Sequence, residues 1–391
     1  MSKITERRQR TATTEIDNKA VLPENGDAKA KSYPSKKVLV VLLIITAIIS
    51  LFLLIVNAWV DSYASAFAPV DIDNAEATAT LDQLPAERQE YYKNFDKYMA
   101  ERAKFKEGYD AAMLNHATAS SSIKWAEGVY NYVVFVLDDM TQEYEKAGTV
   151  SLVSINTNTS KVSYSIIESS TLVYITTIVE GENEQEIVGP LSDAFYWGGA
   201  PLLARAVQDN YGVKVNGYAA LTYSTISTAV DTFGTIDVAD VNAETVAKVN
   251  ETLAKLRKYE DFKEIEDVAL NGNSISINGK QTVAYVKARE NDDYNPFNDL
   301  ADSFTKTVLS GGLGNIIKAL DIAKESVNAS ITRYDFGSLL QHAITNGASL
   351  DKHINTGSTT RKYHVPNVSV CDYTAERTAL VDMIYPAKAE K

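Results

Sequence analysis

Two basic side chains and three carboxylates have the types and spacing that favour phosphate chemistry. Lys287 and Arg289 stand two positions apart near the end of a predicted helix, and Asp292 and Asp293 follow a few residues later. Asp138 ends an apolar, strand-like run about 150 residues earlier. Ammonium and guanidinium groups bind phosphate oxygens, and carboxylates hold divalent cations such as Mg²⁺. These five residues are therefore the candidates for binding an anionic, metal-associated group.

Each candidate also has a simpler structural interpretation. Lys287 and Arg289 can be an exposed pair at a helix C-terminus, where the helix dipole favours cations. Asp138 can cap a turn, and Asp292 and Asp293 can belong to a solvated turn. On a continuous helix, residues i and i+2 do not share a face. The two cations therefore reach one site only if the chain becomes extended there.

Composition excludes several other functions. The 51 acidic and 38 basic residues give a formal net charge of −13, which disfavours binding to nucleic acid. It also repels anionic wall polymers unless a local basic site or a divalent cation intervenes. The single cysteine, Cys371, excludes an intrachain disulfide. No Gly-x-Ser-x-Gly, Walker or Gly-x-Gly-x-x-Gly pattern occurs. The four histidines lack the spacing of a zinc site: His116, His342, His353 and His364.

The clearest structural signal is the apolar run Val38–Val60, 23 residues without an ionisable side chain. About 20 helical residues cross the hydrocarbon core of a bilayer, and helix formation satisfies the backbone there. Residues 1–37 carry nine Lys or Arg, whereas 61–86 carry none, so the positive-inside rule places the N-terminus in the cytoplasm. We expect a single-pass cell-membrane protein with an extracytoplasmic C-terminal domain. The run is too long and starts too late for a cleaved signal peptide, and a buried helix of a soluble protein is the alternative.

The segments around this anchor differ in character. Residues 1–37 are polar and are expected to form a disordered cytoplasmic tail. Residues 61–120 are predicted to be a linker followed by an amphipathic helix over about 85–114. In that helix Tyr91, Phe95, Tyr98, Phe105 and Tyr109 follow a seven-residue repeat with one charged interruption. Two interpretations stay open: a stalk or helix packed on the following domain, or a coiled-coil contact that forms a homodimer.

Beyond residue 120, strand-like and helix-like patterns alternate. Strands are predicted at Tyr132–Leu137, Val150–Ile155, Val162–Ile167, Leu172–Val179, Val215–Leu221, Ile236–Val238 and Tyr363–Val370. Helices are predicted at Pro201–Tyr211, Ser224–Phe233, Ala243–Lys258, Gly279–Ala288, Asp299–Leu309, Ile316–Ser326, Phe336–Ile344 and Ala375–Ile384. Gly198-Gly199 ahead of Pro201 is predicted to be a tight turn that starts a helix. The fold class is α/β, a mixed sheet covered by helices on both faces, with a domain over 121–330 and a C-terminal extension over 331–391.

Several segments resemble, in order, the motifs of the LytR-CpsA-Psr family. Asn131–Asp138 is similar to the opening strand of that family, and Ile277–Arg289 to its segment Leu-Asn-Gly-x-Gln-Ala-Leu-x-Tyr-Val-Arg-x-Arg. The intervening matches are Thr149–Asn156, Lys161–Ile167, Asp193–Leu203 and Val230–Val238. On these motifs and the anchor, the chain is identified as a divergent member of the family.

The resemblance implies both an activity and a set of site residues. Family members transfer glycopolymers from a polyprenyl-pyrophosphate carrier onto peptidoglycan, usually with Mg²⁺, at the membrane surface. By position in the motifs, the implied catalytic residues are Asp138, Lys287 (an arginine in the family) and Arg289. Lys287, Arg289 and Tyr285 would contact the pyrophosphate and lipid. Asp138, Asp292 and Asp293 would hold the metal.

The sequence departs from the family where the phosphate-binding charges are expected. The family's Ser-Ile-Pro-Arg-Asp corresponds here to a segment with Glu168 and Ser169 in place of arginine and aspartate. Its Arg-x-x-Arg-Gln falls on Ala301, Phe304 and Thr305. Transfer from a pyrophosphate depends mostly on charge stabilisation and positioning. These losses therefore predict a degenerate active site.

Three functional hypotheses remain, and the sequence leaves open whether the chain is an enzyme. The first is an active phosphotransferase with a diverged site. The second is a non-catalytic module on the same scaffold that binds lipid carriers or glycans, or regulates another protein. The third is an unrelated surface α/β domain, because fold alone does not imply function.

Overall fold

The computed structural model describes residues 60–101, 103–140, 147–180, 183–289, 300, 303, 304, 306–308, 310–346, 361–363, 368–370 and 372–386. The predicted tail 1–37 and the predicted anchor Val38–Val60, except its last residue, lie outside this part of the chain. Among the described helices, none is both long enough and apolar enough to cross a bilayer. The described residues belong to one compact unit.

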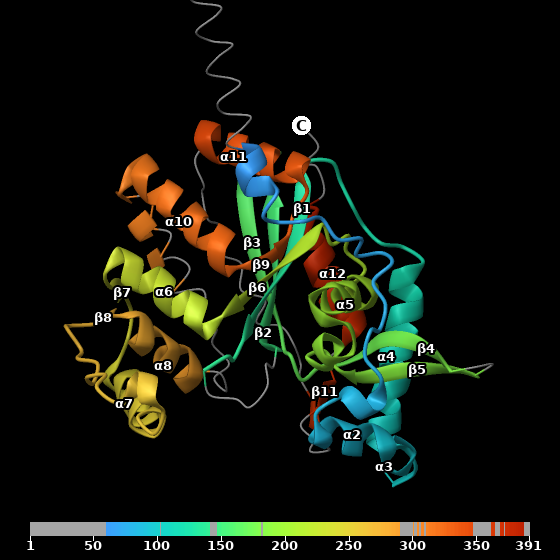
Figure 1. Ribbon diagram of the computed structural model, residues 1–391. Coiled ribbons are helices and arrows are strands. Elements are labelled where there is room, and N and C mark those ends of the chain that lie inside the picture. The colour runs from blue at the N-terminus through green and yellow to red at the C-terminus, as the bar shows by residue number, and fades with distance from the viewer. Residues whose placement is uncertain are drawn as a thin grey trace, which may run out of the picture. The chain divides into compact units, whose positions relative to one another are not determined.

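A five-stranded mixed sheet in the order β3-β2-β1-β6-β9 lies at the centre of the fold (Figure 1). β1 runs antiparallel to β2 and parallel to β6, and the two outer pairs are antiparallel. The sheet strands are β1 (Val129–Leu137), β2 (Ala147–Asn156), β3 (Lys161–Ile167), β6 (Gly217–Thr222) and β9 (Asn328–Ser330). Three two-stranded ladders join β4 (Leu172–Glu180) to β5 (Asn183–Pro190), β7 (Ile236–Val238) to β8 (Ile275–Ile277), and β10 (Arg361–Tyr363) to β11 (Val368–Val370).

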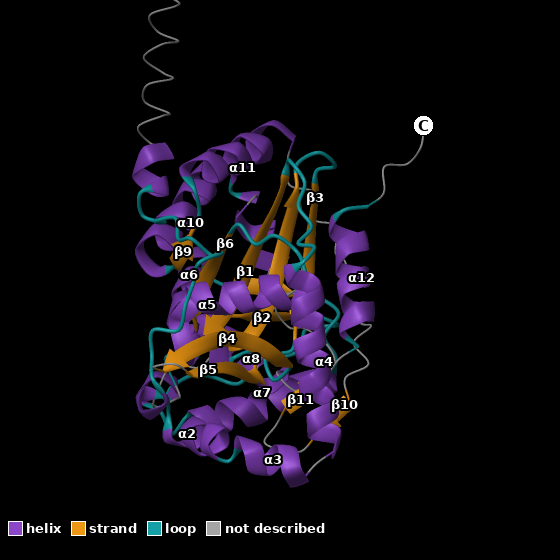
Figure 2. Ribbon diagram, turned by 90° about the vertical axis from the view of Figure 1, so that its right-hand side faces the viewer, coloured by secondary structure: helices purple, strands orange, loops and turns teal. Residues whose placement is uncertain are grey.

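Helices cover both faces of the sheet, which confirms the predicted mixed α/β architecture. One face carries α4 (Ala103–Ser120), α5 (Asp193–Tyr211) and α12 (Tyr373–Ile384), and these lie in front of the sheet in Figure 2. The opposite face carries α6 (Tyr223–Phe233), α8 (Gly279–Arg289) and α10 (Gly312–Ser326). The remaining described helices are η1 (Leu81–Gln83), α2 (Ala86–Lys93), α3 (Phe95–Glu101), α7 (Ala243–Leu256), η2 (Glu260–Phe262) and α11 (Arg333–Asn346).

The alternation of side chains along β1 divides the interior into two cores. Val133 and Phe135 point into a first core shared with α5, whereas Val136 belongs to a second core around β7, β8, α7 and α8. Because β1 has neighbours on both faces, nearly all of its residues are apolar and buried. A central strand of this kind holds its C-terminal end in a fixed position, and that end carries Asp138.

The predicted single helix over 85–114 is wrong. The structure interrupts it at Asn94 (φ −99°, ψ 8°), which ends α2 just before α3 begins at Phe95, and α4 follows beyond Arg102, which lies outside the described residues. The Asn94 side-chain amide donates to Glu90 O (2.8 Å), and such local side-chain bonds compete with a continuing helix.

The aromatic side chains of this region pack on their own domain. Tyr91 is 2% exposed, and Phe95, Tyr98 and Tyr109 contact the first core. The interpretation as helices packed on the following domain is therefore confirmed. A homodimer through this region stays a prediction, and these four side chains are already engaged within the chain.

Several elements differ from the patterns expected. Strands β5, β8 and β9 were not predicted, and the expected strand Tyr363–Val370 is instead two short antiparallel strands, β10 and β11. Gly199 has φ +66° and interrupts α5 at a kink, so Gly198-Gly199 forms the predicted turn. A Cβ on Gly198 would lie 2.5 Å from Glu76 O, which explains the need for glycine there.

Residues 60–67, which begin with the last residue of the predicted anchor, dock on α10 and α11. Tyr63, Ala64 and Phe67 form a small third core with Phe336. The hydroxyl of Tyr63 donates to Asp321 Oδ1 (2.5 Å). The ion pair of Asp61 with Arg333 and a hydrogen bond from Lys324 to Ser62 Oγ (3.0 Å) add polar contacts. Ala323 of α10 packs against this small core.

Candidate functional site

Asp138 lies immediately after β1 and forms a short ion pair with Lys287. Lys287 Nζ donates to Asp138 Oδ2 at 2.6 Å, and the two side chains are 14% and 11% exposed. The other carboxylate oxygen accepts from Met140 N at 3.2 Å. The structure thus brings together two of the predicted site residues, 149 positions apart in sequence. Their catalytic role stays a prediction.

The local sequence of α8 holds Lys287 in place. Asn278 Oδ1 accepts from Gln281 N (2.9 Å), and Gln281 Oε1 accepts from Asn278 N (3.0 Å). This reciprocal pair is a capping box that satisfies donors at the start of the helix. Asp231 Oδ1 accepts from Gly279 N (2.8 Å) and places a negative charge at the helix N-terminus, where the dipole favours it. Asp231 is therefore a structural residue in this arrangement.

An aromatic ring completes the surroundings of the lysine. Lys287 Nζ lies 5.0 Å from the centroid of the Tyr223 ring, within the range of a cation–π contact. Tyr223 is the first residue of α6 and is 3% exposed. No sequence motif marks Tyr223 as a site residue. The only available signal is its place at the start of the predicted helix Ser224–Phe233, two residues before Thr225, which lines the cavity.

The second acidic residue after β1 is also engaged by the protein. Asp139 Oδ1 accepts from Ser224 N (3.1 Å) in the first turn of α6. Magnesium requires several oxygen ligands in octahedral geometry. Both carboxylates at this strand end have protein donors, and the described residues include no group of three acidic, His or Cys side chains that fits a metal. Asp138 and Asp139, each engaged by a protein donor, therefore do not by themselves fit a Mg²⁺ site.

The other predicted site residues are placed differently or are not described. Tyr285 is 0% exposed and packs in the second core. It does not line the cavity, and a ligand role for it stays a prediction. The helical backbone of α8 continues through Arg289, so the extended conformation that would bring Lys287 and Arg289 to one site is absent there. The side chain of Arg289, and Asp292 and Asp293, lie outside the described residues.

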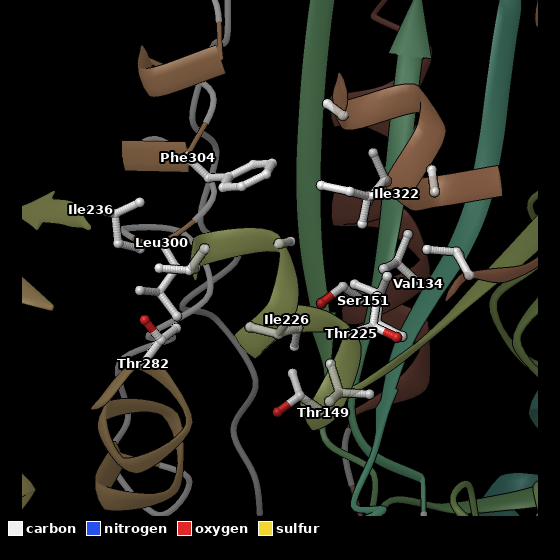
Figure 3. Close-up of a pocket in the computed structure, with 18 of the residues that line it drawn as sticks. Val134, Thr149, Ser151, Thr225, Ile226, Ile236, Thr282, Leu300, Phe304 and Ile322 are labelled. Atoms are coloured by element: carbon white, nitrogen blue, oxygen red, sulfur yellow. The ribbon is translucent and has the colours of Figure 1, made fainter. Parts of the chain in front are cut away.

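An apolar cavity of about 350 Å³ lies between the sheet and the helices α6, α8 and α10 (Figure 3). Among the described residues that line it, the polar atoms are mainly hydroxyls and no side chain is charged. The sheet contributes alternate residues of β1 and β2, a spacing of two that marks one face of a strand. The lining residues are Val134, Val136, Thr149, Ser151, Val153, Tyr164, Leu221, Thr225, Ile226, Ala229, Val230, Ile236, Thr282, Leu300, Phe304, Ala319, Ile322, Ala323 and Val327.

Two positions that depart from the family motifs lie in different places. Phe304, where the family pattern expects an arginine, lines the cavity and contacts the Phe233 ring edge-on at 5.4 Å (Figure 3). Glu168 accepts hydrogen bonds from the hydroxyls of Ser170 and Ser369, each at 2.8 Å. These two hydroxyls belong to the turn after β3 and to β11. Phe304 thus contributes an apolar ring to the cavity wall, and the Glu168 carboxylate is engaged by hydroxyl groups.

Comparisons with known proteins give one family match. The family model described as the LytR_cpsA_psr family matches residues 95–383. A search of curated proteins found no match.

Solved structures with a related backbone are distant in sequence. TagT bound to LI-WTA is 14% identical, with a TM-score of 0.49, and the alignment covers 67% of this chain and 93% of that one. The gbs0355 protein of Streptococcus agalactiae is 14% identical, with a TM-score of 0.49 and coverage of 67% and 90%. TagT of B. subtilis is 14% identical, with a TM-score of 0.46, and the alignment covers 67% of this chain and 94% of that one.

Proposed function

We propose, from the premise that this chain belongs to the LytR_cpsA_psr family, that it is a membrane-anchored cell-envelope protein that binds the lipid carrier of a glycopolymer. The apolar cavity takes part of the polyprenyl chain, and Lys287 meets the pyrophosphate beside the end of β1. Transfer of the glycopolymer to peptidoglycan is the reaction of this family. This chain would perform it with fewer cations than the family motifs contain.

The observation that carries the proposal is a cavity whose described lining is uncharged and whose wall elements also carry a buried ion pair. Val136 of β1 lines the cavity two residues before Asp138, and Thr282 of α8 lines it five residues before Lys287. Thr225 of α6 does so two residues after Tyr223. A ligand with an apolar chain and an anionic head matches this arrangement, because each part meets a surface of its own kind.

The dimensions of the cavity support a partial fit of the chain. A volume of about 350 Å³ is near the lower limit of small-molecule sites, so the cavity takes a segment of a long polyprenyl chain. Apolar surface removed from water contributes about 25 cal/mol per Å². The replacement of an expected arginine by Phe304 extends the apolar wall.

A non-catalytic carrier-binding module is the second candidate. The observation in its favour is that the charge of the Lys287 ammonium is already balanced by the Asp138 carboxylate, 2.6 Å away. Glu168 and Phe304 also stand where the family pattern expects arginines. Such a module would bind the lipid carrier or a glycan without turnover, and a transfer assay separates the two candidates.

The proposal is tested by filling the cavity. The full-length chain in lipid nanodiscs is titrated with farnesol, an uncharged isoprenoid, and with farnesyl pyrophosphate. Ala229 of α6 lines the cavity, and Ala229→Trp should weaken binding of both probes at least tenfold. Ala247 lies exposed on α7, so Ala247→Trp is the matched control and should bind as the unmodified chain does.

The outcome that contradicts the proposal is equally defined. Farnesol binding that is absent, or that Ala229→Trp and Ala247→Trp leave equal, would show that the cavity does not hold the isoprenoid. Release of pyrophosphate from a polyprenyl-pyrophosphate glycopolymer then distinguishes the two candidates. Turnover that Lys287→Met abolishes supports the transferase, and binding without turnover supports the carrier-binding module.

A further inference from the structure

The Lys287–Asp138 pair occupies the place where the family resemblance implies a metal. A divalent cation bound to Asp138 would have to displace an ammonium that donates to Oδ2 at 2.6 Å. It would also compete with Met140 N for the second oxygen. Carboxylates already held by protein donors are poor ligands for Mg²⁺, which demands near-ideal octahedral geometry.

The displaced lysine has little room to move away. Its side chain is 14% exposed and its ammonium lies over the Tyr223 ring. A dication beside it would repel it at short range, and in a poorly solvated site this repulsion is stronger than in water. The ion pair and a metal at Asp138 therefore exclude each other.

The ammonium keeps the capacity to bind an anion. A lysine has three N–H donors and no acceptor, and Asp138 takes one of them. The remaining donors can reach phosphate oxygens while the Asp138 bond persists. Their reach is limited by α8, whose N-terminus is fixed by the Asn278–Gln281 capping box.

We infer that Lys287 takes the place of the divalent cation, so that this chain binds a lipid pyrophosphate without Mg²⁺ at Asp138. The inference rests on the proposed function, because it concerns the head group of the same ligand. It adds a requirement for the head group alone. The cavity binds the apolar chain, whereas the pyrophosphate is bound by Lys287, whose charge is balanced by Asp138, and not by a divalent cation.

The test compares metal dependence with charge dependence in the full-length chain in nanodiscs. Binding of farnesyl pyrophosphate is measured by calorimetry in two buffers, one with about 5 mM Mg²⁺ and one with EDTA. A Mg²⁺ concentration of about this order is chosen to fill a protein Mg²⁺ site. We expect dissociation constants equal within about twofold. Mg²⁺ alone should leave the melting temperature unchanged. Lys287→Met should weaken binding at least tenfold in either buffer, whereas Lys287→Arg should preserve it.

A second lysine on the same helix provides the control. Lys280 also lies near an aromatic ring, that of Phe262 (5.4 Å), and near Asp261 (3.8 Å). Lys280→Met removes the same charge from α8 and should leave the affinity within about twofold of the unmodified chain. Farnesol binding and the melting temperature confirm that each variant is folded.

Two results would overturn the inference. One is a loss of affinity of tenfold or more when EDTA replaces Mg²⁺ in the unmodified chain, an arm that requires no variant. The other is a Lys287→Met chain that binds farnesyl pyrophosphate normally. A chain that binds farnesol but not farnesyl pyrophosphate also overturns it and leaves the carrier-binding proposal standing. A chain that binds neither contradicts both.

Discussion

Two buried ion pairs, one in each core, use similar chemistry in different surroundings. Arg88 of α2 faces Asp193 at the start of α5, with Nε 3.3 Å from Oδ1 and exposed fractions of 10% and 0%. Tyr92 donates to the other oxygen of Asp193 at 3.1 Å. Lys287 and Asp138 are comparably buried but lie beside the cavity wall. The first pair is enclosed by protein, whereas the second adjoins a space for a ligand.

Electrostatics shows how tightly the enclosed pair is held. Burial alone would lower the pKa of Arg88, but the Asp193 carboxylate raises it above its ordinary value. Burial, and then the charge of Asp193, raises the pKa of Tyr92 well above its usual range. These groups therefore keep one protonation state across physiological pH. Aromatic rings contact both pairs, Tyr92 at Asp193 and Tyr223 at Lys287, so the two pairs differ in the cavity-lining residues that lie near Asp138 and Lys287 in sequence.

Removal of Arg88 should have the largest effect. Arg88→Met leaves the Asp193 carboxylate buried without its cation, which destabilises a protein by about 3–5 kcal/mol. Urea denaturation measures this loss, and farnesol binding by the folded fraction should not change. Lys106 and Asp110 form an exposed pair (58% and 56%), so Lys106→Met should cost under about 1 kcal/mol. Equal losses in the two variants would remove the distinction between enclosed and exposed pairs.

Asp138→Asn should destabilise the protein less than Arg88→Met does, and it should strengthen binding of farnesyl pyrophosphate. The Lys287 ammonium loses its partner but is 14% exposed, so the expected loss of stability is about 1–3 kcal/mol. Without the competing carboxylate, the free ammonium should bind farnesyl pyrophosphate about threefold to tenfold more tightly. Calorimetry in EDTA measures this change. Weaker binding in EDTA would indicate that the Asp138 carboxylate holds the Lys287 ammonium in its binding position.

The smallest expected effect on stability concerns His116. Its imidazole ring stacks on the Tyr174 ring, with the two centroids 3.6 Å apart. Burial lowers its pKa below the ordinary value of 6.5, although Asp209 opposes the shift. The unfolded chain then binds more protons, so stability is full above pH 6.5 and falls as the pH drops toward the folded-state pKa.

The pH effect is measured against His116→Phe, a variant that keeps an aromatic ring but has no titratable group. After allowance for solvent screening the contribution of His116 is under about 1 kcal/mol. Denaturation midpoints of the unmodified chain should fall between pH 7 and 5 more than those of His116→Phe. Parallel pH profiles would show that this histidine does not contribute to the pH dependence of folding.

The parts of the fold that the sequence predicted are those with strong periodicity. β1, β2, β3, α6, α7 and α12 follow from apolar runs or amphipathic spacing. β5 was missed because its first half is Asn-Glu-Gln-Glu, which reads as a loop. β8 and β9 have three residues each, too few for a period. The break at Asn94 depends on a side-chain bond to the backbone, which a heptad pattern does not reveal.

The contact between Asp138 and Lys287 was not predictable from the sequence in its geometry. Resemblance to the family selected Asp138 and Lys287, yet their contact joins elements 149 residues apart. The cavity combines one face of two strands with three helices, and no local pattern specifies that combination. The capping box Asn278-x-x-Gln281 has a recognisable sequence signature, which would have identified these motif residues as structural.

Residues 60–67 join the described domain to the predicted anchor Val38–Val60. They contact α10, a helix that also walls the cavity. Eight residues at about 1.5 Å each span only about 12 Å if helical. Such a short tether would confine the search for a lipid carrier to two dimensions, with a high effective concentration. Cutting or lengthening this tether should therefore slow capture of a membrane-embedded carrier while leaving the affinity for a soluble probe unchanged.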